Sequence, residues 1–466
     1  MELLIPLDSR SKKPLYEQIY SHICAEIRSG ALKAGDRLPS TRVLAEHLKV
    51  SRSTTQMAYD QLLAEGYMES RPCRGYFVSH LDELVETGPS GAEEMETTAE
   101  PDAGWRVDFS PRGIDLDSFP YHVWRKLSRN TLVDDNKEMF HSGNHQGEPG
   151  LREAIRSYLH SARGVNCSPE QIIVGAGSEY LLMLLSQILE GKHVIAMENP
   201  TYKQAYRGFQ SLGYEVCPVE MDANGMEPEL LTRSGANVAY VMPSHQFPTG
   251  VVMPVGRRQE LLKWAVEAPD RYIIEDDYDS EFRYRGKPIP ALQGMDRSGR
   301  VIYLGTFSKC IAPAIRVSYL VLPTHLLLRY RSQTSFYAST VSRIDQNILY
   351  QFLAGGYFER HLNRMRAVYK TKHDLLLEQI EPLRERFEIR GEHAGIHILL
   401  TSRQGESEEQ LIQKAEEAGV KVYGLSSYFI HPQHNHRPAT VVLGYASLSE
   451  EQIVEGIRLL MECWGA

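Results

Sequence analysis

Residues 301–316 read VIYLGTFSKCIAPAIR, a short apolar run followed at once by Thr306, Ser308, Lys309 and Arg316. Other apolar runs of this kind lie at 172–177 (IIVGAG), 193–200 (HVIAMENP), 238–244 (VAYVMPS) and 272–278 (YIIEDDY), and a helical pattern follows each of the first three. Short strands that are apolar throughout and alternate with helices predict an α/β domain with a mostly parallel central sheet, covered on both faces. Ligands of such sheets bind at the carboxyl ends of the strands, which is where these polar residues fall.

The residues at the predicted strand ends match the chemical needs of one cofactor. Lys309 offers an amine for a Schiff base, and Asp276 offers a carboxylate for a protonated ring nitrogen. Gly177 and Ser178 open a helix, whose first amides can bind a phosphate, and Tyr202 can stack on a ring. Taken singly, each residue has an ordinary explanation, such as a helix cap or a surface charge. Their joint order predicts a site for pyridoxal 5'-phosphate.

The first 80 residues show a different pattern. Leu15, Ile19, Ile23 and Ile27 recur every four residues and predict one buried face of a helix. Two short helices follow, with Ser40 and Ser51 as N-caps, and residues 67–79 (YMESRPCRGYFVS) read as two strands joined by a turn. In the second short helix the apolar residues predicted to face inward are Met57, Ala58, Leu62 and Leu63. The order predicts a winged helix-turn-helix domain.

Polar residues at the start of the second short helix suit DNA. Hydroxyls near a helix N-terminus can contact phosphates, and Arg or Gln can read base edges in the major groove. A solvated helix with a capping serine has the same features, so this helix alone leaves DNA binding open. The residues expected at DNA are Ser51, Arg52, Ser53, Thr54 and Gln56 on this helix, Arg42 on the helix before it, and Arg71, Arg74 and Gly75 on the wing.

Charge divides the chain into three parts. Residues 1–80 hold 11 Lys and Arg against 9 Asp and Glu, whereas residues 81–104 hold 8 acids and no Lys or Arg. A segment so acidic and so poor in large apolar residues cannot offset the entropy of ordering. We therefore predict a winged helix-turn-helix domain at 1–80, a flexible acidic linker at 81–104, and the α/β domain at 105–466.

The cysteines and the apolar segments indicate the cellular compartment in which the protein is expected. The six cysteines (Cys24, Cys73, Cys167, Cys217, Cys310 and Cys463) form no CxxC pair and show no metal-ligand spacing, which suits a reducing compartment and predicts no metal site. The N-terminus does not read as a secretory signal, and the most apolar helical stretch, around residues 180–189, is too short to span a bilayer. We expect a cytoplasmic protein that does not enter the membrane.

Long motifs carry a family resemblance in both halves. The first 80 residues, with their LPSTR…LA…L.VSR.T pattern, resemble the GntR-type winged-helix head over nearly its full length. The run from PSHQFPTG (243–250) through EDDYDSEFRY (275–284) to GTFSKCIAPAIR (305–316) resembles fold-type I aminotransferases, and specifically the MocR subfamily of GntR regulators. The resemblance implies operator DNA and pyridoxal phosphate as the partner and the cofactor. It assigns roles around the cofactor: Lys309 forms the Schiff base, Asp276 pairs with the pyridine nitrogen, Tyr278 approaches the ring hydroxyl, Tyr202 stacks on the ring, and Gly177, Ser178, Thr306, Ser308 and Arg316 hold the phosphate.

Two positions depart from the family pattern, and a third is a candidate for binding an effector. Phe247 replaces the asparagine that aminotransferases usually place before PTG, so a contact to the cofactor hydroxyl is in question. Gln204 stands where the GABA-responsive relative has an arginine, which disfavours a GABA sensor. By family position, Arg437 is the candidate for binding the carboxylate of an effector, and a surface arginine is the alternative.

The sequence supports three hypotheses. The first is a homodimeric regulator that senses pyridoxal phosphate, or its aldimine with an amino compound, and controls genes of vitamin B6 or amino-compound metabolism. The second is an active aminotransferase with an accessory DNA-binding domain, and the third is a DNA-binding protein whose body only dimerises. The intact cofactor residues disfavour the third hypothesis, and the fused head disfavours the second.

Overall fold

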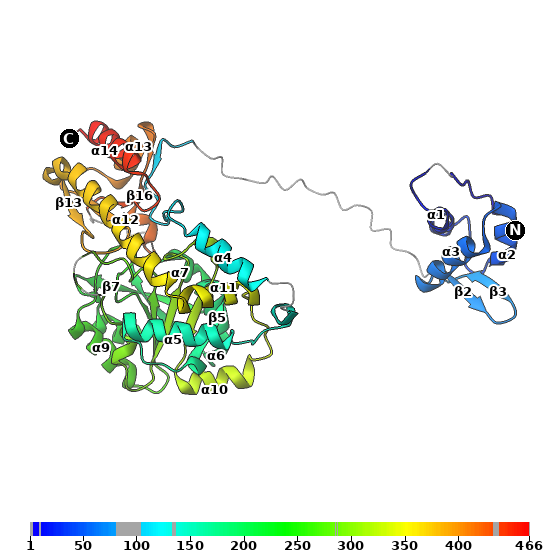
Figure 1. Ribbon diagram of the computed structural model, residues 1–466, viewed down its shortest axis with the longest axis horizontal. Coiled ribbons are helices and arrows are strands. Elements are labelled where there is room, and N and C mark those ends of the chain that lie inside the picture. The colour runs from blue at the N-terminus through cyan, green and yellow to red at the C-terminus, as the bar shows by residue number, and fades with distance from the viewer. Residues whose placement is uncertain are drawn as a thin grey trace. The chain divides into compact units, whose positions relative to one another are not determined.

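The computed structural model describes residues 3–8, 11–80, 104–132, 137–284, 286, 288–431 and 438–465. The chain divides into two compact units, Met1–Glu100 and Pro101–Ala466, which we call the head and the body (Figure 1). The predicted linker, apart from Gly104, lies outside the described residues, and so does Arg437. No helix in the described part of the chain is long and apolar enough to cross a membrane.

The head is a winged helix-turn-helix, as predicted. Its elements are α1 (Leu15–Arg28), β1 (Arg37–Leu38), α2 (Thr41–Leu48), α3 (Arg52–Ala64), β2 (Met68–Arg71) and β3 (Gly75–Val78). Ser40 and Ser51 cap α2 and α3, since their hydroxyls accept from the backbone amides of Val43 and Thr54. The three strands form an antiparallel sheet in the order β1-β3-β2, and the sequence pattern had not indicated β1.

One inward prediction in α3 is wrong. Ala58 and Leu62 are fully buried, but the side chain of Met57 is 51% exposed. Successive residues on a helix are about 100° apart, so Met57 lies on the face of Ser53 and Asp60 and not on the face of Leu62. An apolar side chain therefore stands on the exposed side of the predicted DNA-reading helix.

The body is built on an eight-stranded sheet in the order β5-β12-β11-β10-β9-β6-β7-β8. The strands are β5 (Ile172–Gly175), β6 (Val194–Asn199), β7 (Glu215–Asp222), β8 (Gly225–Met226), β9 (Val238–Val241), β10 (Tyr272–Asp277), β11 (Val301–Thr306) and β12 (Ser318–Val321). All five predicted strands are present, and β7, β6, β9, β10 and β11 pair in parallel. β12 lies antiparallel between β11 and β5, and β8 is antiparallel to β7, so the sheet is mixed with a parallel centre.

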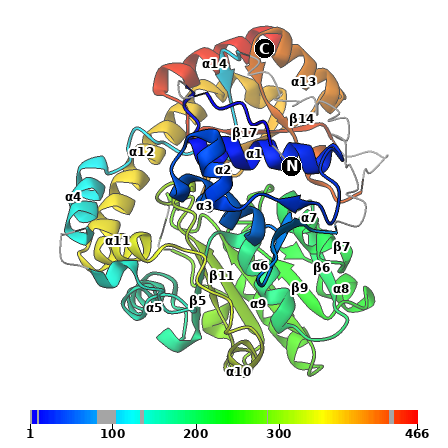
Figure 2. The same ribbon diagram turned by 90° about the vertical axis from the view of Figure 1, so that its right-hand side faces the viewer.

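Helices cover both faces of this sheet, and Figure 2 shows several of them beside the strands. Ile173 packs with helices on one face while its neighbours Ile172 and Val174 pack on the other, which is the alternation of a strand buried on both sides. The covering helices are α5 (Pro149–Arg163), α6 (Ser178–Ile188), α7 (Lys203–Ser211), α8 (Pro228–Arg233), α9 (Val255–Val266), α10 (Thr324–Gln333), α11 (Arg343–Ala354) and α12 (Tyr357–Gln379), with α4 (Tyr121–Thr131) packed on α11.

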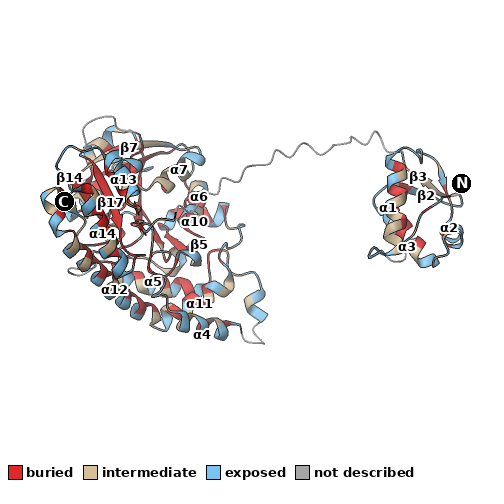
Figure 3. Ribbon diagram, turned by 90° about the horizontal axis from the view of Figure 1, so that it is seen from above, coloured by how far each residue is buried: buried red, intermediate tan, exposed pale blue. Residues whose placement is uncertain are grey.

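The C-terminal part of the body forms a second, smaller layer. An antiparallel sheet in the order β13-β14-β17-β16 packs with two helices, and its strands are largely buried (Figure 3). The elements are β13 (Phe387–Arg390), β14 (His397–Ser402), α13 (Glu408–Glu417), β16 (Tyr423–Gly424), β17 (Thr440–Gly444) and α14 (Glu450–Trp464). A separate parallel pair joins β4 (Val107–Asp108) to β15 (Val420–Lys421).

Candidate functional site

Lys309 follows β11 in a loop at the carboxyl edge of the large sheet. Its side chain is half-buried, and Nζ donates a hydrogen bond to the backbone carbonyl of Arg112 at 2.7 Å. Burial lowers the pKa of Lys309 to about 8, the Arg112 charge adds to this, and the Asp279 carboxylate opposes it. A lysine with such a pKa has a substantial neutral fraction near neutrality, and the neutral amine is the form that attacks an aldehyde.

Asp276 lies in β10, at the same edge of the sheet. Its side chain is 8% exposed, and one carboxylate oxygen accepts a hydrogen bond from the Tyr240 hydroxyl. Burial raises the pKa of Asp276 to about 7, while the bond from Tyr240 lowers it. No cationic side chain of the described residues forms an ion pair with Asp276. A protonated pyridine nitrogen would supply the missing positive charge, so the carboxyl fits the cofactor.

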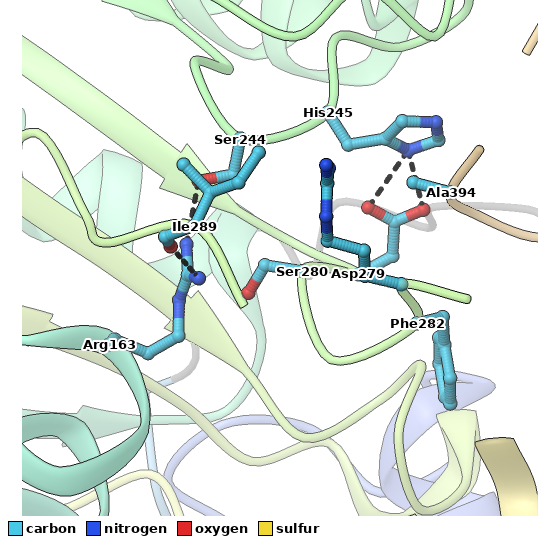
Figure 4. Close-up of a pocket in the computed structure, with 9 residues that line it drawn as sticks. Arg163, Ser244, His245, Asp279, Ser280, Phe282, Ile289 and Ala394 are labelled. Carbon is cyan, nitrogen blue, oxygen red and sulfur yellow. Dashed lines mark hydrogen bonds and ion pairs between the residues drawn. The ribbon is translucent and has the colours of Figure 1, made fainter. Parts of the chain in front are cut away.

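Tyr278 belongs to a buried group that the sequence pattern did not reveal. The Nδ1 atom of His245 lies 2.9 Å from the Tyr278 hydroxyl, and 2.9 and 3.1 Å from the two carboxylate oxygens of Asp279. Figure 4 shows His245 above Asp279 with both of the latter contacts. Burial, together with the Asp279 charge, raises the pKa of Tyr278. Tyr278 therefore keeps its proton, and its hydroxyl is hydrogen-bonded within the His245 and Asp279 group.

A small cavity adjoins this group (Figure 4). It has about 10 Å³ of room for a water-sized molecule and is lined by Arg163, Ser244, His245, Asp279, Ser280, Phe282, Arg283, Ile289 and Ala394. Three buried atoms of its lining, His245 Nε2, Ser280 Oγ and Arg283 Nε, have no hydrogen-bond partner in the described structure. A space of this size holds about one water molecule, so it is not the place of an effector.

Two of the residues predicted to bind the phosphate, Gly177 and Arg316, lie together where β5 meets α6. Gly177 is the N-cap of α6 at φ +96°, and a Cβ added there would lie 2.2 Å from a terminal nitrogen of Arg316. Only glycine lets the backbone and the guanidinium approach this closely. Arg316 donates to the Glu179 carboxylate at 2.9 Å, and α6 has no side-chain cap. The first amides of α6 and Arg316 together form an anion cradle that a phosphate fits.

The two hydroxyl residues after β11 are also in place. Thr306 Oγ1 accepts from Ser318 Oγ at 2.9 Å and from the backbone amide of Ser308 at 3.2 Å. The Ser318 hydroxyl thus fixes the Thr306 side chain. Thr306 ends β11, and Ser308, Lys309 and Arg316 lie on the loop between β11 and β12. Arg316 lies against Gly177 at the N-terminus of α6.

Tyr202 stands at the N-terminus of α7 and packs against an aromatic cluster. Its ring lies 6.1 Å from that of Phe247 in an edge-to-face arrangement. Phe247 in turn contacts the rings of Tyr278, His397 and Tyr428. Phe247, which replaces the usual asparagine, therefore offers an apolar ring with no side-chain group that can form a hydrogen bond. The contact of Tyr278 with the cofactor hydroxyl stays a prediction.

The expected DNA residues lie on the surface of the head. Arg52 is exposed at the first position of α3, and the Ser51 hydroxyl lies 2.7 Å from that of Ser53 and 2.8 Å from that of Thr54. Other members of the set are paired within the head: Arg42 with Glu46, Gln56 with Asp60, and Arg71 with Glu69. Arg74 is exposed in the wing turn, and Gly75 follows it at φ +102°. The DNA contacts themselves stay a prediction.

The geometry defines a class of protein: a winged-helix head joined to a body with an aminotransferase-type lysine site. Comparison with known proteins agrees. Residues 115–459 match the family of class I and II aminotransferases, and residues 15–78 match the bacterial regulatory proteins of the gntR family. The multiple substrate aminotransferase from Thermococcus profundus superposes with a TM-score of 0.69 at 27% identity, covering 78% of this chain and 91% of its own. The body is thus a fold-type I, pyridoxal-phosphate-binding domain.

Relatives that match the whole chain identify the family. The HTH-type transcriptional regulator YdeL of Bacillus subtilis is 41% identical over 97% of both chains. The rhizopine catabolism regulatory protein MocR of Rhizobium meliloti is 35% identical over 98% of this chain and 95% of its own. The pyridoxine biosynthesis regulator PdxR of Corynebacterium glutamicum is 32% identical over 92% of each chain. The chain belongs to the MocR subfamily of GntR-type transcription regulators.

Proposed function

We propose that this protein is a cytoplasmic regulator whose head binds operator DNA and whose body senses pyridoxal phosphate, alone or combined with an amino compound. The observation that carries the proposal is the site at the sheet edge. Asp276 lies in β10, and Lys309 and Arg316 lie in the loop after the adjacent strand β11, on the same chain as a winged-helix head. This placement supports the proposed cofactor site. When bound, the cofactor supplies an aldehyde that reacts reversibly with amines. A ligand of this site acts as an effector only if it favours one arrangement of the protein over another.

A homodimer is part of the proposal. Several large apolar side chains of the body are exposed in the single chain, and they lie on α4, in the segments that flank it, and from the end of α10 to α11: Leu116, Tyr121, Leu132, Phe140, Phe336, Tyr337 and Tyr350. Exposed apolar side chains grouped on neighbouring segments are typical of an interface, and this grouping supports the proposed dimer. Two bodies joined there would present two heads to a repeated DNA site.

We propose regulation and not turnover as the main role, because a metabolic enzyme gains little from a DNA-reading head. Transamination is the second candidate, and one observation favours it: burial lowers the pKa of Lys309 to about 8, so its amine suits Schiff-base chemistry. Incubating the loaded protein with amino acids and following conversion of the cofactor to its amine form separates the two. Sustained turnover at rates of about 1 per second or more, typical of enzymes, would favour the enzyme.

The relatives point to two kinds of target gene. One is named for pyridoxine biosynthesis and another for rhizopine catabolism. The deciding measurement is the affinity for the DNA upstream of this protein's own gene, with cofactor-free protein, with pyridoxal phosphate, and with both cofactor and a panel of amino compounds. A shift with pyridoxal phosphate alone indicates control of vitamin B6 genes. A shift that also needs one amino compound identifies that compound as the effector. Absence of DNA binding in every state contradicts the proposal.

A further inference from the structure

Arg112 places a charged side chain at the lysine site that the sequence pattern did not indicate. It lies in the loop SPRG (110–113), and its backbone carbonyl accepts the hydrogen bond from Lys309 Nζ at 2.7 Å. The two residues are 197 positions apart in the chain. The side chain of Arg112 is exposed, so a ligand can reach it.

The guanidinium of Arg112 is held in place without being neutralised. In the amide orientation that satisfies both groups, the Gln204 oxygen accepts from the two terminal nitrogens of Arg112 at 2.7 and 2.8 Å. Gln204 is on α7, two residues beyond Tyr202. Among the described residues no carboxylate forms an ion pair with Arg112, whereas Arg316 is paired with Glu179 and Arg163 with Asp277. Arg112 therefore has a full charge and N–H donors to spare.

The charge of Arg112 acts on the groups around the lysine. Burial raises the pKa of Tyr202 and of Tyr428 to about 12, and the nearby Arg112 opposes the rise in both. Burial and Arg112 both lower the pKa of Lys309. Together with the bond from Lys309 Nζ to the Arg112 carbonyl and the contact of Arg112 with Gln204, these effects place the Arg112 cation beside the lysine site.

We propose that Arg112, oriented by Gln204, binds the carboxylate of an amino-acid effector whose amine takes the place of Lys309 on the cofactor aldehyde carbon. This inference rests on the proposed function. A guanidinium binds a carboxylate through two parallel hydrogen bonds, and the anion cradle of Gly177 and Arg316 is reserved for the cofactor phosphate. In the exchange the incoming amine loses two hydrogens and Lys309 Nζ regains two, so no oxidant or reductant is needed.

The test compares amines with and without a carboxylate on the full-length, cofactor-loaded protein. L-alanine, β-alanine and 4-aminobutyrate vary the distance from amine to carboxylate, and ethylamine and propylamine lack the carboxylate. Titration followed by the visible absorbance of the cofactor gives an apparent Kd for each. We expect at least one amino acid to bind about 10-fold more tightly than its matched amine. Arg112→Gln should weaken that amino acid about 10- to 100-fold and leave the plain amines within about 2-fold, in line with the loss of a charge-assisted pair.

Two further variants sharpen the result. Arg112→Lys keeps the charge without the planar pair of donors and should give an intermediate Kd. Arg156→Gln, at a half-buried position of α5 where the side chain pairs with Glu153, is the control and should leave each Kd unchanged. Equal weakening of amines and amino acids by Arg112→Gln would mean that Arg112 acts only through Lys309, and would overturn the inference. Equal affinity of the wild type for both kinds of compound would also overturn it. A wild type without the visible band contradicts the proposed function itself.

Discussion

The head and the body hold their functional residues in opposite ways. On the head, Arg52 and Arg74 point into solvent, and the pairs around them are single contacts on the surface. In the body, Asp276, Tyr278 and His245 are buried or half-buried and bonded to one another or to neighbours from other strands. An exposed residue that binds a partner can be substituted without disturbing the fold of its domain, whereas substitution of a buried residue also disturbs the packing around it. Substitutions in the head and in the body should therefore differ in their effects on binding and on stability.

The largest expected effect is at the lysine. Lys309→Ala removes the amine that joins the cofactor, so the visible absorbance of the loaded protein should vanish entirely. The head has its own core, so cofactor-free DNA affinity should stay within about 2-fold of the wild type, well inside the 10-fold change that 1.4 kcal/mol represents. Absorbance spectroscopy and DNA titration check the two halves. A variant that kept the visible band would refute the assignment of Lys309.

The buried carboxyl gives a pH effect of intermediate size. Burial raises the pKa of Asp276 to about 7 in the folded, cofactor-free body, from about 3.9 in an unfolded chain. Between these values the folded state binds more protons than the unfolded state, so stability falls as pH rises toward 7 and then levels off. Asp276→Asn removes this contribution.

We expect the Tm of the cofactor-free wild type to fall relative to that of Asp276→Asn as the pH is raised from 5 to 7.5. Glu198, Glu275 and Glu281 also have pKa values raised to about 7 by burial, but they are present in both proteins and cancel. Scanning calorimetry at several pH values makes the comparison. Parallel curves would show that Asp276 is already ionised in the folded body.

A smaller effect is expected on the head. Arg52→Ala removes an exposed cation at the start of α3, and loss of one base or phosphate contact costs about 1–3 kcal/mol. Operator affinity should fall about 10-fold, while the cofactor spectrum stays the same. Fluorescence anisotropy with labelled operator measures the first and absorbance the second. An unchanged affinity would remove Arg52 from the DNA surface.

The smallest effect is expected at Met57, and Leu62 on the same helix serves as the buried comparison. Met57→Ala should alter the free energy of unfolding of the head by no more than about 0.5 kcal/mol, as is usual on a surface. Leu62→Ala, at a fully buried position, should cost about 2–5 kcal/mol. Chemical unfolding of both variants tests the pair. Similar losses would mean that Met57 is buried after all, as its sequence pattern had suggested.

The repeating apolar pattern of the sequence predicted the strands and the residues at their ends. Contacts between residues that are far apart in the chain were not predicted. The apolar runs placed Asp276 and Lys309 at strand ends, because parallel strands end at one edge of a sheet. β12 was missed although its direction could have been inferred. Only residues 307–317 separate it from β11, too few for the crossover that a parallel neighbour needs. The contacts of His245 with Asp279 and of Lys309 with Arg112 depend on tertiary packing, and each residue alone reads as an ordinary polar loop residue.

The hydrogen bond from Lys309 to the Arg112 carbonyl links chemistry to the beginning of the body. Arg112 comes four residues after β4, the first strand of the body along the chain from the head. Any reaction at the lysine nitrogen alters the bond that fastens this loop. The loop closely follows β4, so a change in the hydrogen bonding of Lys309 Nζ reaches the N-terminal part of the body through a short stretch of chain.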